Sequence, residues 1–177
     1  MKGGAPEGVR RLGEEVEKLG RQRLVLKSDQ KPAIKARLQS VKRGKHQDIA
    51  FEHSPVAERQ SNGAAERTVK TVQGQVRTMK MALEARIAEK VVETSDLVPW
   101  SIRHAAMLVN IGQRGDAGRT AWERVKGRKF NREAPEFGER IMFLKPSSLG
   151  KDKLDSRWET GRFLGIQDDS AELIAGA

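Results

Sequence analysis

The sequence contains no cysteine and no tyrosine, and it has only three histidines among its 177 residues. Without cysteine there is no disulfide, no thiolate zinc site and no cysteine nucleophile. The histidines, His46, His53 and His104, are too far apart in the sequence to indicate a histidine-based zinc module. A disulfide scaffold and a zinc-finger architecture are therefore not expected.

Aromatic residues make up 5% of the chain, and no apolar run approaches the roughly 20 residues of a membrane span. Residues 1–20 are charged and contain glycines, without the apolar core of a secretion signal. Apolar residues at 37% and charged residues at 33% are typical of a globular chain. We expect a soluble, intracellular protein with a thin aliphatic core, long enough for one domain or a truncated domain with an appendage.

The formal net charge is +10, and most of it comes from one segment. Residues 21–47 contain nine Lys or Arg against one acid, Asp29, which is a net +8. Such a cluster releases counterions from a phosphate backbone and gives salt-dependent, sequence-independent affinity for nucleic acid. A solvated basic surface is the alternative interpretation, because basic tracts are common in proteins.

The order of apolar and turn residues in the first part of the chain predicts an α/β architecture. Residues 9–19 have helical spacing and end at Gly20, residues 23–27 form a short apolar run, and residues 33–41 return to helical spacing. A second short strand is expected at residues 48–51. The expected order is therefore helix, strand, helix, strand.

The longest periodic element begins after residues 61–63 and predicts an amphipathic helix. Its apolar residues recur at three- and four-residue steps: Val69, Val72, Val76, Met79, Leu83 and Ile87. Glu66 lies three residues before Val69, so we expect it to share the inward stripe of this helix. Ser61 or Asn62 is the expected N-cap, and Gly74 inside the pattern costs about 1 kcal/mol.

The second half of the chain predicts two further helices followed by short strands. A helix is expected at residues 100–111, and a shorter one begins at residues 120–123. The expected core residues of the first of these helices are Trp100, Ala105, Leu108 and Val109. Beyond a boundary near Phe130, β-rich segments at 140–144 and 158–166 predict a small set of antiparallel strands or an open barrel.

No nucleotide-binding glycine loop, Ser/His/Asp series or zinc motif is present, so any catalysis has to come from carboxylates. Asp29 is expected at a strand end and Glu66 in the first turn of the long helix, 37 positions later. Two carboxylates so placed can converge on Mg²⁺ or Mn²⁺, and a pair of such ions promotes phosphoryl transfer. On spacing alone, a turn aspartate and a helix-capping glutamate are the more ordinary interpretation.

The segments around these carboxylates resemble the catalytic core of integrases. They are KSDQ at 27–30, EHSP at 52–55 and QSNGAAER at 60–67. Further segments, in the same order, resemble the region after the core in copia-type retrotransposon polyproteins: residues 99–110, 120–123, 127–129, 137–139 and 154–166. The chain thus resembles a copia-type retrotransposon integrase over most of its length, from about Arg23 to Ile166.

This resemblance implies a truncated ribonuclease-H-like core at residues 1–95, a helical connector at 96–130 and a small β-rich C-terminal module at 131–177. It implies that Asp29 and Glu66 are catalytic and are ligands of Mg²⁺ or Mn²⁺. The first catalytic aspartate and the first strands would lie in an upstream polyprotein segment. The intact integrase would be nuclear and multimeric, so a homo-oligomer is implied, and it would carry out metal-dependent DNA strand transfer.

For this chain by itself we expect DNA binding without catalysis. The residues expected to contact nucleic acid are Lys27, Lys31, Lys35, His53, Asn62, Arg67 and Lys70. Two functional interpretations remain open at this point: a fragment of the strand-transfer enzyme, or a non-catalytic basic nucleic-acid-binding module derived from a decayed retroelement. A third is an unrelated basic α/β protein, which would have to treat the ordered series of segments as chance.

Overall fold

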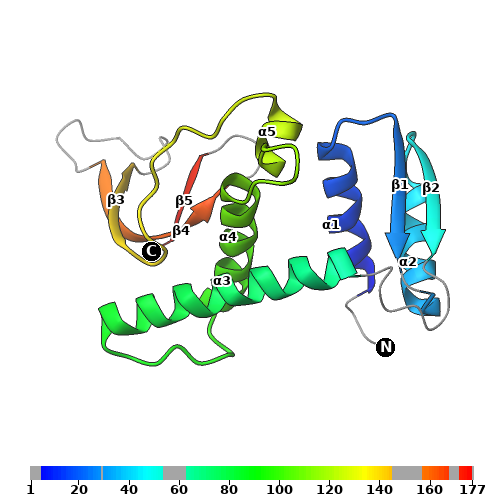
Figure 1. The fold of residues 1–177 in the computed structure, drawn as a ribbon. Helices are drawn as coiled ribbons and strands as arrows, with labels where there is room; N and C mark the ends of the chain where they lie inside the picture. The colour runs from blue at the N-terminus through cyan, green and yellow to red at the C-terminus, as the bar shows by residue number, and fades with distance from the viewer. Residues whose placement is uncertain (1–4, 29, 54–62, 145–156, 168–171, 177) are drawn as a thin grey trace. The chain divides into compact units, whose positions relative to one another are not determined.

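The computed structural model describes residues 5–28, 30–53, 63–144, 157–167 and 172–176. The chain is mixed α/β, with helices and two small sheets (Figure 1). It divides into two compact units, Met1–Thr68 and Val69–Ala177. In the described residues, no helix is both long enough and apolar enough to cross a membrane.

The first unit is built from α1 (Ala5–Lys18), β1 (Arg23–Ser28), α2 (Pro32–Arg43) and β2 (Asp48–His53). The two strands pair in parallel, and α2 is the helical crossover that joins them (Figure 1). Two residues set the ends of the helices: Gly20, with φ 61°, follows α1, and Pro32 occupies the first turn of α2. The predicted helix–strand–helix–strand order is confirmed.

One face of this two-stranded sheet is covered by both helices. The core consists of Val16 from α1, Val41 from α2 and Ile49 from β2, each with at most 2% of its surface exposed. Both strands alternate, so that Leu24 and Leu26 point inward while their neighbours are exposed. The alternation places the strand-end residues Ser28 and His53 on the same side as the core.

The second unit contains most of α3 (Gly63–Ile87), then α4 (Leu97–Gly112) and α5 (Ala121–Lys126). Strands β3 (Arg140–Leu144), β4 (Trp158–Ile166) and β5 (Leu173–Gly176) follow and form an antiparallel sheet in the order β3-β4-β5. Both segments predicted to be strands here have the expected bounds, whereas β5 was not predicted. The described strands form an open three-stranded sheet and not a closed barrel.

Helix α4 packs on two different partners. Ala105 joins Met79 and Leu83 of α3 in one buried cluster, and Met107 joins Phe163 of β4 in another. Trp122 of α5 belongs to the second cluster. The predicted helical connector and the predicted β-rich module therefore share one core.

Two expectations about α3 are corrected by the structure. Val69 is 55% exposed, so the inward stripe does not begin there, and Glu66 is exposed as well. Val72 is the first apolar residue of α3 that is partly buried, because it packs against the cluster that contains Met79, Leu83 and Ala105. Helical periodicity identifies a stripe, but it does not say where along the helix the covering elements start.

The assignment of the first unit to a ribonuclease-H-like core stays a prediction, since its described sheet has two strands. The domain boundaries predicted at residues 95 and 130 also stay predictions. The compact units divide between Thr68 and Val69, inside helix α3.

Candidate nucleic-acid interface

The carboxyl ends of β1 and β2 bring Ser28 and His53 together. They are register partners in the parallel pair, and Ser28 Oγ lies 3.2 Å from His53 Nδ1. Which of the two atoms donates depends on the histidine tautomer. The His53 ring also stacks on Phe51, with centroids 6.3 Å apart. Ligands of open parallel sheets bind at the carboxyl ends of the strands. Residue 29 directly follows the carboxyl end of β1 in the sequence.

The predicted pair of catalytic carboxylates is described only in part. Asp29 lies outside the described residues, so its position relative to Glu66 stays a prediction. Glu66 is exposed in the first turn of α3, where the helix dipole favours a carboxylate. The described residues contain no group of three or more His, Asp or Glu side chains that could hold a metal ion. Glu66 is the one described member of the predicted pair, and a single carboxylate does not complete a Mg²⁺ site, which needs several oxygen ligands.

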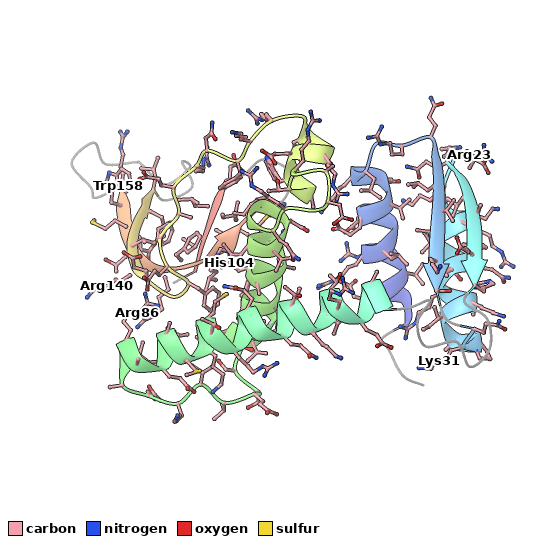
Figure 2. The ribbon with its side chains drawn as sticks, viewed as in Figure 1. Arg23, Lys31, Arg86, His104, Arg140 and Trp158 are labelled. Carbon is pink, nitrogen blue, oxygen red and sulfur yellow. The ribbon has the colours of Figure 1, made fainter. Side chains whose placement is uncertain are left out.

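The residues predicted to contact nucleic acid take up different positions. Lys27 lies on the outward face of β1, where its Nζ is 2.7 Å from the Glu52 carboxylate across the strand pair. Lys31 precedes α2 and is exposed, at the opposite end of β1 from Arg23 (Figure 2). Lys35 is half-buried on α2.

The other three predicted contacts fall around the start of α3. Arg67 and Lys70 are both exposed on this helix, on either side of the unit boundary. Asn62 lies outside the described residues. The structure therefore brings Ser28 and His53 together at the carboxyl end of the strand pair and places Lys27 on the opposite face. The grouping of Arg67 and Lys70 with them stays a prediction.

Helix α2 carries positive charge that its own side chains do not neutralise. Its charged residues are Lys35, Arg37, Lys42 and Arg43, and the helix contains no acid. None of the four forms an ion pair with another described residue. Lys42 instead lies over the Phe51 ring, 5.5 Å from its centroid. The remaining exposed positions of α2 are alanine, proline, glutamine and serine, so nothing acidic or bulky stands between the cations.

Helix α1 shows the opposite arrangement. Arg10 Nη2 and Arg11 Nε each lie 2.7 Å from the same Glu7 carboxylate, and Arg10 also pairs with Glu14. Hydrogen bonds from Arg10, and then from Arg11, lower the pKa of Glu7 to about 2. Two helices of one unit thus differ sharply, because the cations of α1 are neutralised locally and those of α2 are not.

A second basic surface lies on the outward face of β3 and β4 in the second unit. Arg140 and Arg162 are directly opposite each other in the antiparallel register. Met142 is 65% exposed, and Trp158 is 53% exposed at the far end of the same face (Figure 2). Sequence reasoning predicted both strands but not this surface. Alternation along 140–144 and 158–166 was the signal that could have revealed it.

His104 is the one histidine of the second unit and is buried, with 4% of its surface exposed. Its ring stacks on Phe137 with a centroid distance of 5.9 Å and meets Phe163 edge-on at 5.3 Å. Nδ1 has no hydrogen-bond partner among the described residues. Burial lowers the pKa of His104, because the imidazolium form would lose its hydration. His104 belongs to α4, and Figure 2 shows it on the side of this helix that faces the sheet. Its aromatic contacts indicate a packing role.

No protein-family model and no curated protein matches this chain. Among solved structures, a chain of the simian T-cell lymphotropic virus intasome in complex with PP2A regulatory subunit B56 gamma, determined by cryo-electron microscopy, is similar with a TM-score of 0.47 and 17% sequence identity. The likeness covers 92% of this chain and 55% of that chain, so this chain spans about half the length of its neighbour. Neither the activity nor the partners of this chain follow from so distant a likeness.

Proposed function

We propose that this chain binds nucleic acid through the phosphate backbone, without reading base sequence. The observation that carries the proposal is helix α2, which has four cations, no acid and no ion pair to any described residue. Lysine and arginine side chains that are not already paired are the ones that displace counterions from phosphates. The balanced helix α1 of the same unit has no such surplus.

The exposed part of α2 suits contact with a charged strand. Arg37 and Arg43 are six residues apart and both exposed, which separates them by about 9 Å along the helix axis. The small residues Ala33 and Ala36 leave room for close approach of a backbone. Guanidinium groups also bind phosphate oxygens with two parallel hydrogen bonds.

The outward face of β3 and β4 supports the same function in the second unit. Arg140 and Arg162 are directly opposite each other in the register, and Arg162 Nη1 donates to the Gly138 carbonyl at 3.1 Å, so this face presents two neighbouring cations to a phosphate. An exposed indole such as that of Trp158 is a stacking surface for an unpaired base.

The sequence resemblance extends the proposal to a role in DNA strand transfer of the integrase type. What supports this extension is the order of the resembling segments, together with Glu66 in the first turn of α3 and Ser28 at the end of β1, directly before Asp29. Mg²⁺ or Mn²⁺ held by Asp29 and Glu66 would supply charge stabilisation for phosphoryl transfer. The described residues supply one of these carboxylates only, so the geometry of this chain supports DNA binding best. A non-catalytic module derived from a retroelement requires only that binding function.

The test measures the affinity for duplex DNA by fluorescence anisotropy at a series of salt concentrations. Two labelled duplexes of unrelated sequence are compared. We expect equal affinities for both duplexes, and a linear fall of log K with log salt whose slope is about −0.9 per phosphate contacted. Six or more contacts would lower the affinity by roughly a thousandfold or more between 50 and 200 mM salt. A flat titration, or no binding at the lowest salt, would contradict the proposal.

A further inference from the structure

Helix α2 carries a single hydroxyl side chain, Ser40, among its cations. Ser40 is exposed, and its Oγ donates to the Ala36 carbonyl at 3.0 Å in a hydrogen bond that is itself exposed. A serine hydroxyl rotates easily between such acceptors and water. The Oγ atom is therefore accessible to a reagent from solvent.

Arg37 and Arg43 are the neighbours of Ser40 on the surface of the helix. They lie three residues before it and three residues after it, and side chains at this spacing have Cβ atoms roughly 5–6 Å apart. Ala36 and Gly44, four residues away on either side, are small and uncharged. All four neighbours are exposed. A group attached to Ser40 would thus lie between two guanidinium groups, with no bulky side chain beside it.

The charge pattern around Ser40 suits a kinase that selects basic substrates. Kinases discriminate their substrates partly by flanking charge, and Ser40 has arginine three residues before it and Lys42 and Arg43 after it. One other hydroxyl residue of the sequence, Thr160, has arginine at the same distance before it, but it lies within the paired part of β4. Ser40 lies in the last turn of α2, and because helix ends fray, this turn can open to a kinase.

We propose that Ser40 is a phosphorylation site that switches off nucleic-acid binding by α2, an inference that rests on the function proposed above. The phosphoryl donor is ATP. The bond between Ser40 Oγ and the γ-phosphorus forms as the bond from that phosphorus to the oxygen bridging to the β-phosphate breaks. ADP leaves with the bridging oxygen, and the hydroxyl proton passes to a base of the kinase.

The phosphate acts on the two arginines that flank it. Phosphoserine carries a charge of about −1.5 to −2 near pH 7 and three acceptor oxygens. Unmodified α2 has four cations and no acid, so the modification neutralises close to half of its charge. Guanidinium groups bind phosphate oxygens with paired hydrogen bonds, so Arg37 and Arg43 would be held within the helix and lost to a DNA backbone.

The first part of the test asks whether Ser40 is modified. The full chain and its Ser40→Ala variant are incubated with ATP, Mg²⁺ and the catalytic subunit of cyclic-AMP-dependent protein kinase, and peptide mass spectrometry locates the phosphate. We expect Ser40 to be the main acceptor, so that the variant incorporates at least about tenfold less phosphate. A wild-type chain left unmodified at Ser40 would overturn the proposal.

The second part measures the affinity of the phosphorylated chain for duplex DNA by fluorescence anisotropy. We expect at least about a tenfold loss at roughly 100 mM salt, and a salt slope shallower by about 1.8, because two phosphate contacts are lost. Circular dichroism should show an unchanged helix content. A loss of helix in step with the loss of affinity would mean that the phosphate melts α2, which would contradict pairing with the two arginines.

Ser40→Glu and Thr78→Glu are a matched pair of variants. Both sites are exposed helix positions whose hydroxyl donates to the carbonyl four residues earlier, but Thr78 has Gln75 and Met81 where Ser40 has its two arginines. We expect Ser40→Glu to lower DNA affinity by about threefold or more, and Thr78→Glu by less than about twofold. Equal losses in the two variants would overturn the proposal.

The unmodified chain separates this inference from the proposed function. If it does not bind duplex DNA, the function proposed for α2 fails, and the switch fails with it. If it binds and the affinity survives phosphorylation of Ser40, the switch alone is contradicted.

Discussion

Ser28 Oγ lies 3.2 Å from His53 Nδ1, where β1 and β2 end side by side. The two residues are 25 positions apart in the sequence, and the parallel register alone makes them neighbours. The His53 ring also stacks on Phe51, so it has a contact on β2 as well as on β1. The residue after Ser28 is Asp29, which lies outside the described residues, so its position relative to this contact stays a prediction.

The first prediction concerns His53 and Asn62, which flank the chain between β2 and α3. We expect His53→Phe, which keeps a ring against Phe51, to weaken duplex DNA binding by about three- to tenfold and to cost about 0.5–1.5 kcal/mol in unfolding free energy through the lost hydrogen bond. Anisotropy and urea unfolding measure the two effects. If Asn62→Ala lowered the melting temperature and left DNA affinity unchanged, Asn62 would be a helix cap and not a DNA contact.

The second prediction is that the chain binds one divalent cation weakly and has no strand-transfer activity. The resemblance implies a third catalytic carboxylate in an upstream segment, and a two-ion site that clamps the attacking and leaving oxygens would need it. Electron paramagnetic resonance with Mn²⁺ measures the binding, and Asp29→Asn or Glu66→Gln should each abolish it. Binding that persists in both variants would remove these two residues from the metal site. Mg²⁺-dependent strand transfer by the purified chain would show that it is catalytically complete.

The third prediction concerns pH and His104. Burial places the folded-state pKa of His104 below the unfolded value of about 6.5, so the unfolded chain binds the proton more readily. Its contribution to stability is therefore present above pH 6.5 and is lost as the pH falls through 6.5 toward the lowered folded pKa. The loss is up to about 1.4 kcal/mol per pH unit in that window. Urea unfolding at several pH values gives the free energy of unfolding for the wild type and for His104→Leu. This free energy should fall as the pH is lowered below 6.5 in the wild type but not in the variant. Equal slopes would mean that other groups cause it.

The fourth prediction contrasts two glycines. A Cβ at Gly161 would lie 2.6 Å from the Gly176 carbonyl oxygen and 2.7 Å from the Phe143 ring, so Gly161→Ala has to separate β4 from β5. We expect a loss of about 1–3 kcal/mol. Gly74, inside α3, has nothing within 4 Å of its Cβ position, so Gly74→Ala should stabilise the chain by about 1 kcal/mol. Urea unfolding compares both variants with the wild type, and a stabilising Gly161→Ala would contradict the close approach of these strands.

Much of the element order could be predicted because the periodic signals are local. Short runs rich in β-favouring residues predicted β3 and β4 at their observed bounds, and three- and four-residue spacing predicted α3. Strand β5 has only four residues, which is too short for its alternation to be distinguished, and it pairs with β4 across a register shift near Gly165. The burial of His104 was also hidden, because an aromatic neighbour such as Phe163 lies far along the chain.

The candidate interface was only partly predictable for the same reason. Counting residues located the basic segment at 21–47, but it did not show which charges are neutralised. Arg23 and Lys27 find carboxylates on β2, 25 positions away, and Lys45 pairs with Glu17 on α1. Those partners depend on the parallel register and on helix packing, so only the fold identifies α2 as the helix whose cations remain available.

The measurement that tests the central claim most directly compares two double variants of equal charge change. Arg37→Gln/Arg43→Gln removes two cations of α2, and Arg10→Gln/Arg11→Gln removes two cations that α1 already neutralises with Glu7. Anisotropy titrations across a salt series give log K against log salt for each protein, with circular dichroism as the check on folding. We predict that the α2 variant loses about two phosphate contacts, so that its salt slope becomes shallower by roughly 1.8, while the α1 variant keeps the wild-type slope. Equal slopes in the two variants would contradict the assignment of DNA binding to α2.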